Sequence, residues 1–136
     1  MTMGAIAIAL AAAVCAGLAH AGVRDNRGAA YFKKGEYDKA IADETKAIEI
    51  DPKFAEAYVN RGIAYLAKGE HDKAIADFTK AIQLKPDLAE AYYNRGVSYE
   101  RLGRKAEAIA DYRSTLALSR LDTDAQAALK RLGAAP

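Results

Sequence analysis

Few residues of this chain have the types and the spacing that catalysis needs. Serine occurs three times, at Ser98, Ser114 and Ser119, and neither of the two histidines is placed to activate one of these hydroxyls. The sequence contains no His-x-x-x-His pair and no glycine-rich phosphate loop after a strand. We therefore predict that the protein is not an enzyme, and that it has no catalytic residues, no metal site and no small-molecule cofactor.

Two local groups of charged residues could be mistaken for an acid–base pair or a ligand site. Glu36 and Asp38 stand at a turn before an expected helix, where carboxylates interact favourably with the positive end of the helix dipole. His71 lies between two acidic residues at the next such turn. We interpret the carboxylates as helix N-terminal charges and His71 as a solvated surface residue, not as a base or a metal ligand.

The charge distribution argues against a nucleic-acid-binding protein. The 136 residues carry 20 basic and 18 acidic side chains, and the two signs are interleaved and form no basic block. Hydrophobic residues make up 51 % of the chain, which is ordinary for a folded domain with its own core. We predict a protein or peptide partner and no nucleic acid partner.

Asparagine is the polar residue with the most regular spacing. Asn26, Asn60 and Asn94 are each followed by Arg-Gly and recur at one constant interval. Tyrosine, glycine and alanine recur in the same register, at positions 31, 65 and 99, at 35, 69 and 103, and at 40, 74 and 108. This constant interval indicates a repeat protein with units at 21–54, 55–88 and 89–122.

Each unit is expected to be a pair of antiparallel helices. In the second unit, apolar residues recur at helical spacing over 55–68 and again over 72–84. Gly69 falls where the first helix needs a residue with positive φ, and Pro86 follows the end of the second helix. A small residue such as Gly62 allows the two backbones to approach closely. Since each helix has one apolar face, the pairs must stack on their neighbours.

This pattern resembles the tetratricopeptide repeat, whose characteristic period matches the interval found here. The signature positions in the second unit are Tyr58, Gly62, Tyr65, Ala74, Phe78, Ala81 and Pro86. The resemblance implies an all-α fold in which three helix-turn-helix repeats, within 22–122, form a right-handed α-α superhelix with a concave inner face. A capping helix in 123–136 brings the expected number of helices to about seven.

The capping helix is predicted from the residues at its start. Thr123 and Gln126 have the spacing of a capping box, in which Thr123 is the N-cap residue. The helix should run to about residue 131. Leu121, Leu129 and Leu132 are expected to cover the open end of the third repeat.

Glu44 departs from the repeat pattern. Its equivalents, Phe78 and Tyr112, are aromatic and should face the next repeat, where an unpaired carboxylate would be costly. Glu44 could hydrogen-bond a tyrosine, could extend to solvent, or could lie in a locally loosened first repeat. We favour the last interpretation.

In the family that the chain resembles, the first helix of each pair lines the concave face, where partners bind. The residues predicted to contact a partner are Asn26, Val59, Asn60, Ile63, Tyr93, Asn94, Val97 and Arg101. An asparagine amide can both donate to and accept from a peptide backbone, and the apolar members can hold a side chain. The alternative is that the asparagines bond only local backbone or solvent.

Some repeats of this family hold the C-terminal carboxylate of chaperones with basic and amide residues at five groove positions. In this sequence those positions are occupied by Asp25, Ala29, Asn60, Glu90 and Asn94. Asn60 fits the requirement, whereas Asp25 and Glu90 would repel a carboxylate. The sequence therefore argues against a co-chaperone of that kind.

The N-terminus differs in composition from the repeats. No charged side chain precedes Arg24, and an apolar run ends in Ala-His-Ala at 19–21. This small-x-small ending is typical of a secretory signal peptide spanning 1–21 and predicts export, to the periplasm. The alternatives are an uncleaved membrane anchor, since 4–23 is long enough to span a bilayer, and a buried or disordered tail.

These observations predict a non-enzymatic adaptor or scaffold that binds a peptide or helix of a partner protein in the concave groove. Two alternatives stay open. The chain could be a self-assembling structural module, since the open ends of solenoids are adhesive. It could also be a membrane-tethered scaffold, and a membrane is a partner only if the N-terminal segment is retained.

Overall fold

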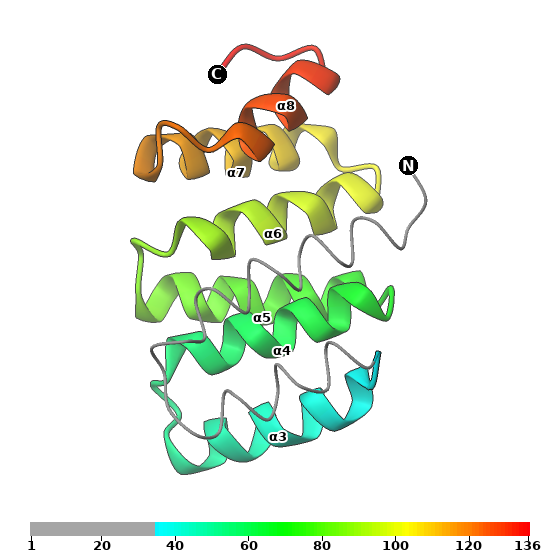
Figure 1. Ribbon diagram of the computed structural model, residues 1–136, viewed down its shortest axis with the longest axis vertical. Helices are drawn as coiled ribbons and strands as arrows, with labels where there is room; N and C mark the ends of the chain where they lie inside the picture. Colours follow the sequence, from blue (N-terminus) through cyan, green and yellow to red (C-terminus); the bar gives the residue numbers. More distant parts are fainter. Residues whose placement is uncertain (1–34) are drawn as a thin grey trace.

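Residues 35–136, the part of the chain that the computed structural model describes, form six α-helices and no strand (Figure 1). The helices are α3 (Tyr37–Ile50), α4 (Ala55–Ala67), α5 (His71–Leu84), α6 (Ala89–Arg101), α7 (Lys105–Leu118) and α8 (Thr123–Arg131). The predicted signal peptide over 1–21 and the first helix expected in the first repeat lie outside the described residues.

The helices stack in chain order along the long axis of the molecule, as Figure 1 shows. Consecutive helices pack against each other, and α4 also contacts α6. The pair α4 and α5 forms the second repeat, α6 and α7 form the third, and α3 is the second helix of the first. Equivalent helices begin and end at equivalent positions of their repeats. The predicted all-α repeat solenoid is confirmed.

Glycine closes the turn between the two helices of each repeat. Gly69 has a φ of 79° and Gly103 a φ of 75°, in the left-handed region that residues with a Cβ rarely adopt. The following N–H group then reaches back over the end of the helix, from Glu70 to Tyr65 O at 2.9 Å and from Arg104 to Tyr99 O at 2.9 Å. The turn predicted at Gly69 is confirmed.

A second glycine in each repeat lets the paired helices approach closely. A Cβ placed on Gly62 would lie 2.7 Å from Cε1 of Phe78, and one on Gly96 would lie 2.9 Å from Cε1 of Tyr112. Both aromatic side chains are fully buried, with 0 % of their surface exposed. The ring of the second helix therefore lies directly against the bare backbone of the first helix of the same repeat.

We expect Gly62→Ala to lower the free energy of unfolding by about 1 kcal/mol. Alanine favours a helix over glycine by about 1 kcal/mol, but forcing a methyl group against the buried Phe78 ring costs about 1–3 kcal/mol. Urea denaturation followed by circular dichroism measures the change. Because Phe78→Leu makes room for the methyl group, the double variant should lose less stability than the sum of the two single variants. Simple additivity would contradict the packing argument.

The capping helix differs from the prediction at its start. Its N-cap residue is Asp122, whose Oδ1 accepts a hydrogen bond from the Ala125 N–H at 2.9 Å, so the assignment of Thr123 as N-cap is wrong. The Gln126 side chain donates instead to Arg120 O at 3.0 Å. An aspartate one residue earlier competes well as a cap, because the carboxylate also interacts with the helix dipole.

The end of the capping helix and two of the three leucines expected to cover the third repeat, Leu129 and Leu132, follow the prediction. The helix ends at Arg131, and Leu129 is fully buried against the core. Leu121, however, is 88 % exposed, so the expectation that it covers the third repeat is wrong. Leu121 lies in the turn before α8, which leaves Leu129 and its neighbours to close the core.

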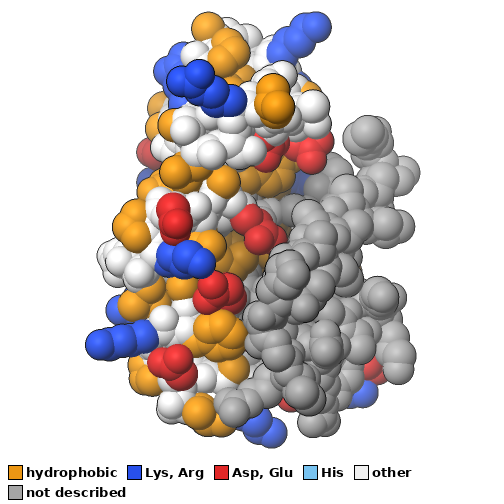
Figure 2. All heavy atoms as spheres, turned by 60° about the vertical axis from the view of Figure 1, so that its left-hand side comes forward, with side chains coloured by type: hydrophobic (Ala, Val, Ile, Leu, Met, Phe, Trp, Pro, Cys, Tyr) orange, Lys and Arg blue, Asp and Glu red, His pale blue; other side chains and the backbone are white. Residues whose placement is uncertain are grey.

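The surface of the described residues carries mixed charge. On the face drawn in Figure 2, acidic and basic side chains are scattered among apolar ones and do not gather by sign. No helix among residues 35–136 has both the length and the apolar character required to cross a bilayer.

Candidate functional site

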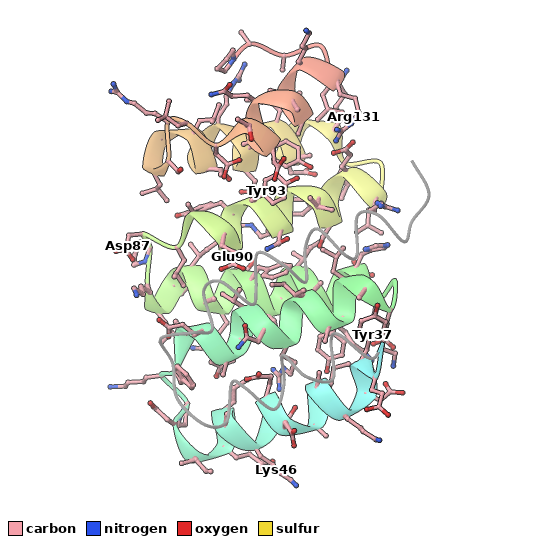
Figure 3. All side chains as sticks on the ribbon, viewed as in Figure 1. Tyr37, Lys46, Asp87, Glu90, Tyr93 and Arg131 are labelled. Carbon is pink, nitrogen blue, oxygen red and sulfur yellow. The ribbon has the colours of Figure 1, made fainter. Side chains whose placement is uncertain are left out.

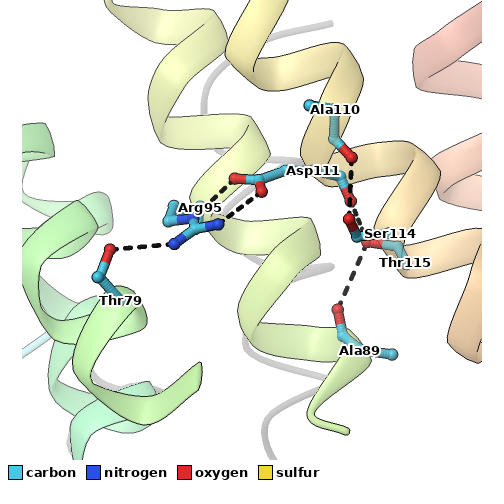
Figure 4. A network of polar contacts seen from close by, with 7 residues as sticks. All are labelled: Thr79, Ala89, Arg95, Ala110, Asp111, Ser114 and Thr115. Carbon is cyan, nitrogen blue, oxygen red and sulfur yellow. Dashed lines mark hydrogen bonds and ion pairs between the residues drawn. The ribbon is translucent and has the colours of Figure 1, made fainter. Parts of the chain in front are cut away.

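The Arg95 side chain forms a partly buried ion pair within the third repeat and a hydrogen bond to the second (Figure 4). Nε and Nη2 of Arg95 on α6 donate to the two carboxylate oxygens of Asp111 on α7, each at 2.8 Å. Nη1 of the same side chain donates to Thr79 Oγ1 on α5 at 3.1 Å. The Asp111 side chain is 6 % exposed. The hydrogen bonds to Asp111 raise the pKa of Arg95 above its ordinary value, and one guanidinium therefore links three helices.

The same arrangement occurs one repeat earlier. Arg61 donates to the Asp77 carboxylate at 2.7 and 2.8 Å and to Thr45 Oγ1 at 3.2 Å. The sequence carried a signal for this pair: an arginine and an aspartate recur 16 residues apart in each of these two units. Sequence reasoning did not use this signal. The arginine of the recurring Asn-Arg-Gly sequence therefore has a structural role.

Asn60, one of the predicted partner contacts, hydrogen-bonds within the chain. It is 4 % exposed, and its Nδ2 donates to Glu44 Oε1 at 3.3 Å. Glu44 is itself 2 % exposed, so it does not extend to solvent. The pair joins α3 to α4, and replacement of Asn60 would affect folding as well as any binding.

Asn94, the equivalent of Asn60 in the third repeat, has a different environment. Its Nδ2 donates to the backbone carbonyl of Glu90, one turn earlier on α6, at 3.0 Å. Its Oδ1 is buried and accepts no hydrogen bond from the described part of the chain. A buried amide oxygen without a donor is costly, and Asn94 therefore has unused capacity to accept a hydrogen bond.

The other predicted site residues divide by exposure. Val59, Ile63 and Val97 are buried and belong to the hydrophobic core cluster, Tyr93 is half-buried, and Arg101 is exposed. Asn26 lies outside the described residues. Helical spacing places these members of α4 and α6 on one side of each helix. We use the name α4–α6 face for the side of these two helices that carries Val59, Asn60, Ile63, Glu90, Tyr93, Asn94, Val97 and Arg101. Their contact with a partner stays a prediction.

The C-terminal part of α6 is held by the capping helix. Arg131 on α8 donates from Nη2 to both carboxylate oxygens of Glu100 on α6, each at 2.8 Å. The Tyr112 hydroxyl donates to the same carboxylate at 2.7 Å, and its ring lies 5.6 Å from that of Tyr93. Burial raises the pKa of Tyr93 to about 12, so the phenol stays protonated at neutral pH. Glu100 therefore has its charge neutralised within the chain.

Glu90, at the N-terminal end of the same helix, has no such partner. No ion pair or hydrogen bond from another side chain reaches its carboxylate among the residues that the structure describes. Burial alone raises the pKa of Glu90 from 4.5 to about 7. Figure 3 labels Glu90 on α6, with Tyr93 on the same helix. The sequence placed Glu90 in the groove, but the burial of its carboxylate and the lack of a partner among the described residues emerge only from the structure.

Histidine and serine are the other residue types that could have done chemistry in the described part of the chain. His71 is half-buried and so is less exposed to solvent than the sequence suggested. Burial and then Arg101 lower the pKa of His71 below its ordinary value. The buried Ser98 hydroxyl donates to Asn94 O at 3.0 Å. Within residues 35–136 no group of three His, Cys, Asp or Glu side chains lies together as a metal site would require.

Comparison with known families identifies the repeat. Residues 28–69 and 64–103 match the family described as TPR repeat, and residues 89–120 match the one described as Tetratricopeptide repeat. The comparison with curated proteins found no match.

Solved structures agree with this assignment. The TPR domain of Arabidopsis OM64 is 35 % identical, with a TM-score of 0.78 over 79 % of this chain and 89 % of that one. The second TPR domain of human RPAP3, in complex with the HSP70 peptide SGPTIEEVD, is 31 % identical, with a TM-score of 0.77 over 82 % of this chain and 93 % of that one.

A third similar structure is the first TPR of Spaghetti (RPAP3) bound to the HSP90 peptide SRMEEVD. It is 31 % identical, with a TM-score of 0.77 over 79 % of this chain and 88 % of that one. The family match extends over more than half of the sequence and the fold agrees with it. The chain therefore belongs to the tetratricopeptide-repeat family.

Proposed function

We propose that this chain is a non-enzymatic interaction module that binds an extended segment of another protein on the α4–α6 face. The observation that carries the proposal is that two similar structures, each 31 % identical to this chain, hold a short peptide. Domains of this family are in general interaction modules without catalytic activity.

The chemistry of the α4–α6 face supports this proposal. Tyr93 offers a half-buried ring with a protonated hydroxyl, and Asn94 Oδ1 is an acceptor without a donor among the described residues. A peptide backbone supplies N–H donors at regular spacing, and its side chains can contact the ring. Arg101 adds an exposed donor at the end of the same helix.

The test uses a positional-scanning library of N-acetylated, C-amidated decapeptides and the full chain. We expect the library to select a peptide, and we expect Tyr93→Ala to weaken its binding about tenfold, since a central aromatic anchor contributes about 1–2 kcal/mol. Fluorescence anisotropy with the selected peptide measures the change.

Tyr92→Ala is the matched control, because it removes the same side chain from the neighbouring position of α6. Tyr92 faces the other way, with the Arg95 guanidinium 5.7 Å from its ring. We expect its removal to leave peptide affinity within about twofold. Thermal melts establish that both variants are folded. Equal weakening by the two variants would place the binding surface elsewhere.

Self-assembly is a second candidate function, and exposed leucines at the C-terminal end of the solenoid favour it. Leu118 is 46 % exposed and Leu121 is 88 % exposed. A shallow pocket lined by Leu116 and Arg120, among others, lies in the same region. A dimer that forms with rising concentration in sedimentation, without any peptide, would favour this candidate.

Export to the periplasm belongs to the proposal as well, with a membrane-tethered scaffold as its alternative. Both rest on the apolar segment over 1–21, whose composition suits a signal peptide or an anchor. Whether the mature protein retains this segment distinguishes the two.

A further inference from the structure

The same glutamate position has a lysine partner in the second repeat and none in the third. In the second repeat this position is Glu56 on α4, and Lys85 Nζ lies 3.3 Å from its Oε1. In the third repeat the equivalent glutamate is Glu90, and the position of the lysine is taken by Ser119. Serine carries no charge and is too short to replace the ammonium group. The third repeat therefore keeps the acid and lacks its cation.

The backbone shows that Ser119 and Lys85 are structural equivalents. Each is the residue that ends the second helix of its repeat, with φ and ψ of −144° and 92° at Lys85 and −138° and 87° at Ser119. Their N–H groups bond the helix in the same way, to Ala81 O at 2.8 Å and to Thr115 O at 2.7 Å. The chain thus holds the geometry for an ion pair at Glu90 without the cation that would complete it.

Asn94 provides a second, independent indication at the same place. Its amide is fixed against the turn that carries Glu90 by the hydrogen bond from Nδ2 to Glu90 O at 3.0 Å. Asn94 is 2 % exposed, and its Oδ1 has no donor within the described part of the chain. Residues four apart on a helix are neighbours. Two acceptors, one a carboxylate, therefore stand one turn apart without a donor from residues 35–136.

We infer that Glu90 and Asn94 form a subsite for a lysine or arginine side chain of the bound partner segment. The inference rests on the proposed function, because the cation arrives on a peptide bound to the α4–α6 face. A lysine ammonium has three donors and an arginine guanidinium five, so either can satisfy the carboxylate and the amide oxygen together.

Three cations near α6 in the described part of the chain are already paired with other carboxylates. On the elements packed against α6, Arg61 is paired with Asp77, Lys85 with Glu56, and Arg131 with Glu100. None of them is within ion-pair distance of Glu90 in the part of the chain that the structure describes. Burial already disfavours the ionised form of this carboxylate, which an incoming cation would stabilise. The same carboxylate disfavours acidic segments such as SRMEEVD.

The experiment applies the decapeptide library to the full chain, to Glu90→Gln and to Ser119→Lys. In the parent chain we expect lysine or arginine to be enriched about tenfold over glutamine at one library position, as for a partly buried charge pair. Both variants should lose this enrichment while retaining selection at the other positions. Glu90→Gln removes the acid, and Ser119→Lys supplies the missing cation from within the chain, as Lys85 does for Glu56.

Two variants of matched chemistry serve as controls. Glu107→Gln removes a carboxylate from an exposed pair with Arg104, and Ser114→Lys adds a positive charge elsewhere on α7. Both should keep the cation enrichment, and circular dichroism establishes that all variants are folded.

The outcomes separate this inference from the proposed function. Peptides selected without any preference for lysine or arginine, or with a preference that survives Glu90→Gln, would overturn the subsite and leave the interaction module standing. A library from which no peptide is selected would overturn both. If the control variants lose the enrichment equally, the enrichment comes from overall charge, and the subsite is overturned.

Discussion

Arg95→Ala should lower the free energy of unfolding by about 3–5 kcal/mol, because it leaves the buried Asp111 carboxylate without its cation. Both bonds of the bidentate pair are 2.8 Å long, and the Asp111 side chain is 6 % exposed. The same substitution removes the donor to Thr79 on α5. We expect the denaturant m-value to fall as well, since loss of this link allows the third repeat to unfold before the second.

The double variant Arg95→Met, Asp111→Leu tests the physical reason for this loss. If the cost comes from the unpaired buried charge, removing both charges should restore most of the stability of the parent chain. Arg104→Ala is the matched control, because its pair with Glu107 is exposed to solvent and should contribute little to stability. A double variant as unstable as Arg95→Ala would show that the pair stabilises the fold through its geometry, and our explanation would be wrong.

Glu90 should make the protein less stable as the pH rises from about 4.5 to about 7. Burial raises the pKa of Glu90 in the folded chain from 4.5 to about 7, so the folded state holds this proton after the unfolded state has released it. Between these values the folded state binds more protons, and stability therefore decreases with pH. The full shift corresponds to about 3 kcal/mol. Because water reaches the half-buried carboxylate, we expect about 2 kcal/mol.

Glu90→Gln should remove this dependence. Its free energy of unfolding should exceed that of the parent chain by about 2 kcal/mol at pH 8 and equal it at pH 4. Urea denaturation at several pH values measures both, with Glu107→Gln as the control on an exposed glutamate. A gain that is the same at pH 4 and pH 8 would show that the amide packs better than the carboxyl group, and that titration of Glu90 has no part in the effect.

Most of the fold could be predicted from the sequence. The helix bounds repeat with the period read from the sequence, and the turn at Gly69 and the end of α8 at Arg131 are where the pattern placed them. Local rules suffice here, because amphipathic spacing and positive-φ glycines act within one or two turns of the chain. The N-cap of α8 was missed because Asp122 and Thr123 are both good caps and only the hydrogen bond distinguishes them.

The candidate site could be predicted only in outline. The sequence placed Asn60 and Asn94 at equivalent positions, yet Asn60 bonds Glu44 and Asn94 bonds its own helix. These differences depend on which side chains of neighbouring helices lie close by. Residue spacing along one helix does not determine the distances to another helix. The recurrence of arginine and aspartate 16 residues apart was visible, but its meaning depended on how α6 packs between α5 and α7.

By itself the sequence determined that this is an all-α repeat protein of the tetratricopeptide type, because period, turn residues and apolar faces are properties of a single chain segment. Only the tertiary structure decided which charges are paired. In the sequence Glu56, Glu90 and Glu100 are simply three glutamates in expected helices. In the structure Lys85 pairs with Glu56 and Arg131 with Glu100, and no cation of the described residues reaches Glu90. An ion pair depends on distances of a few ångströms between helices, and those distances exist only once the helices have packed.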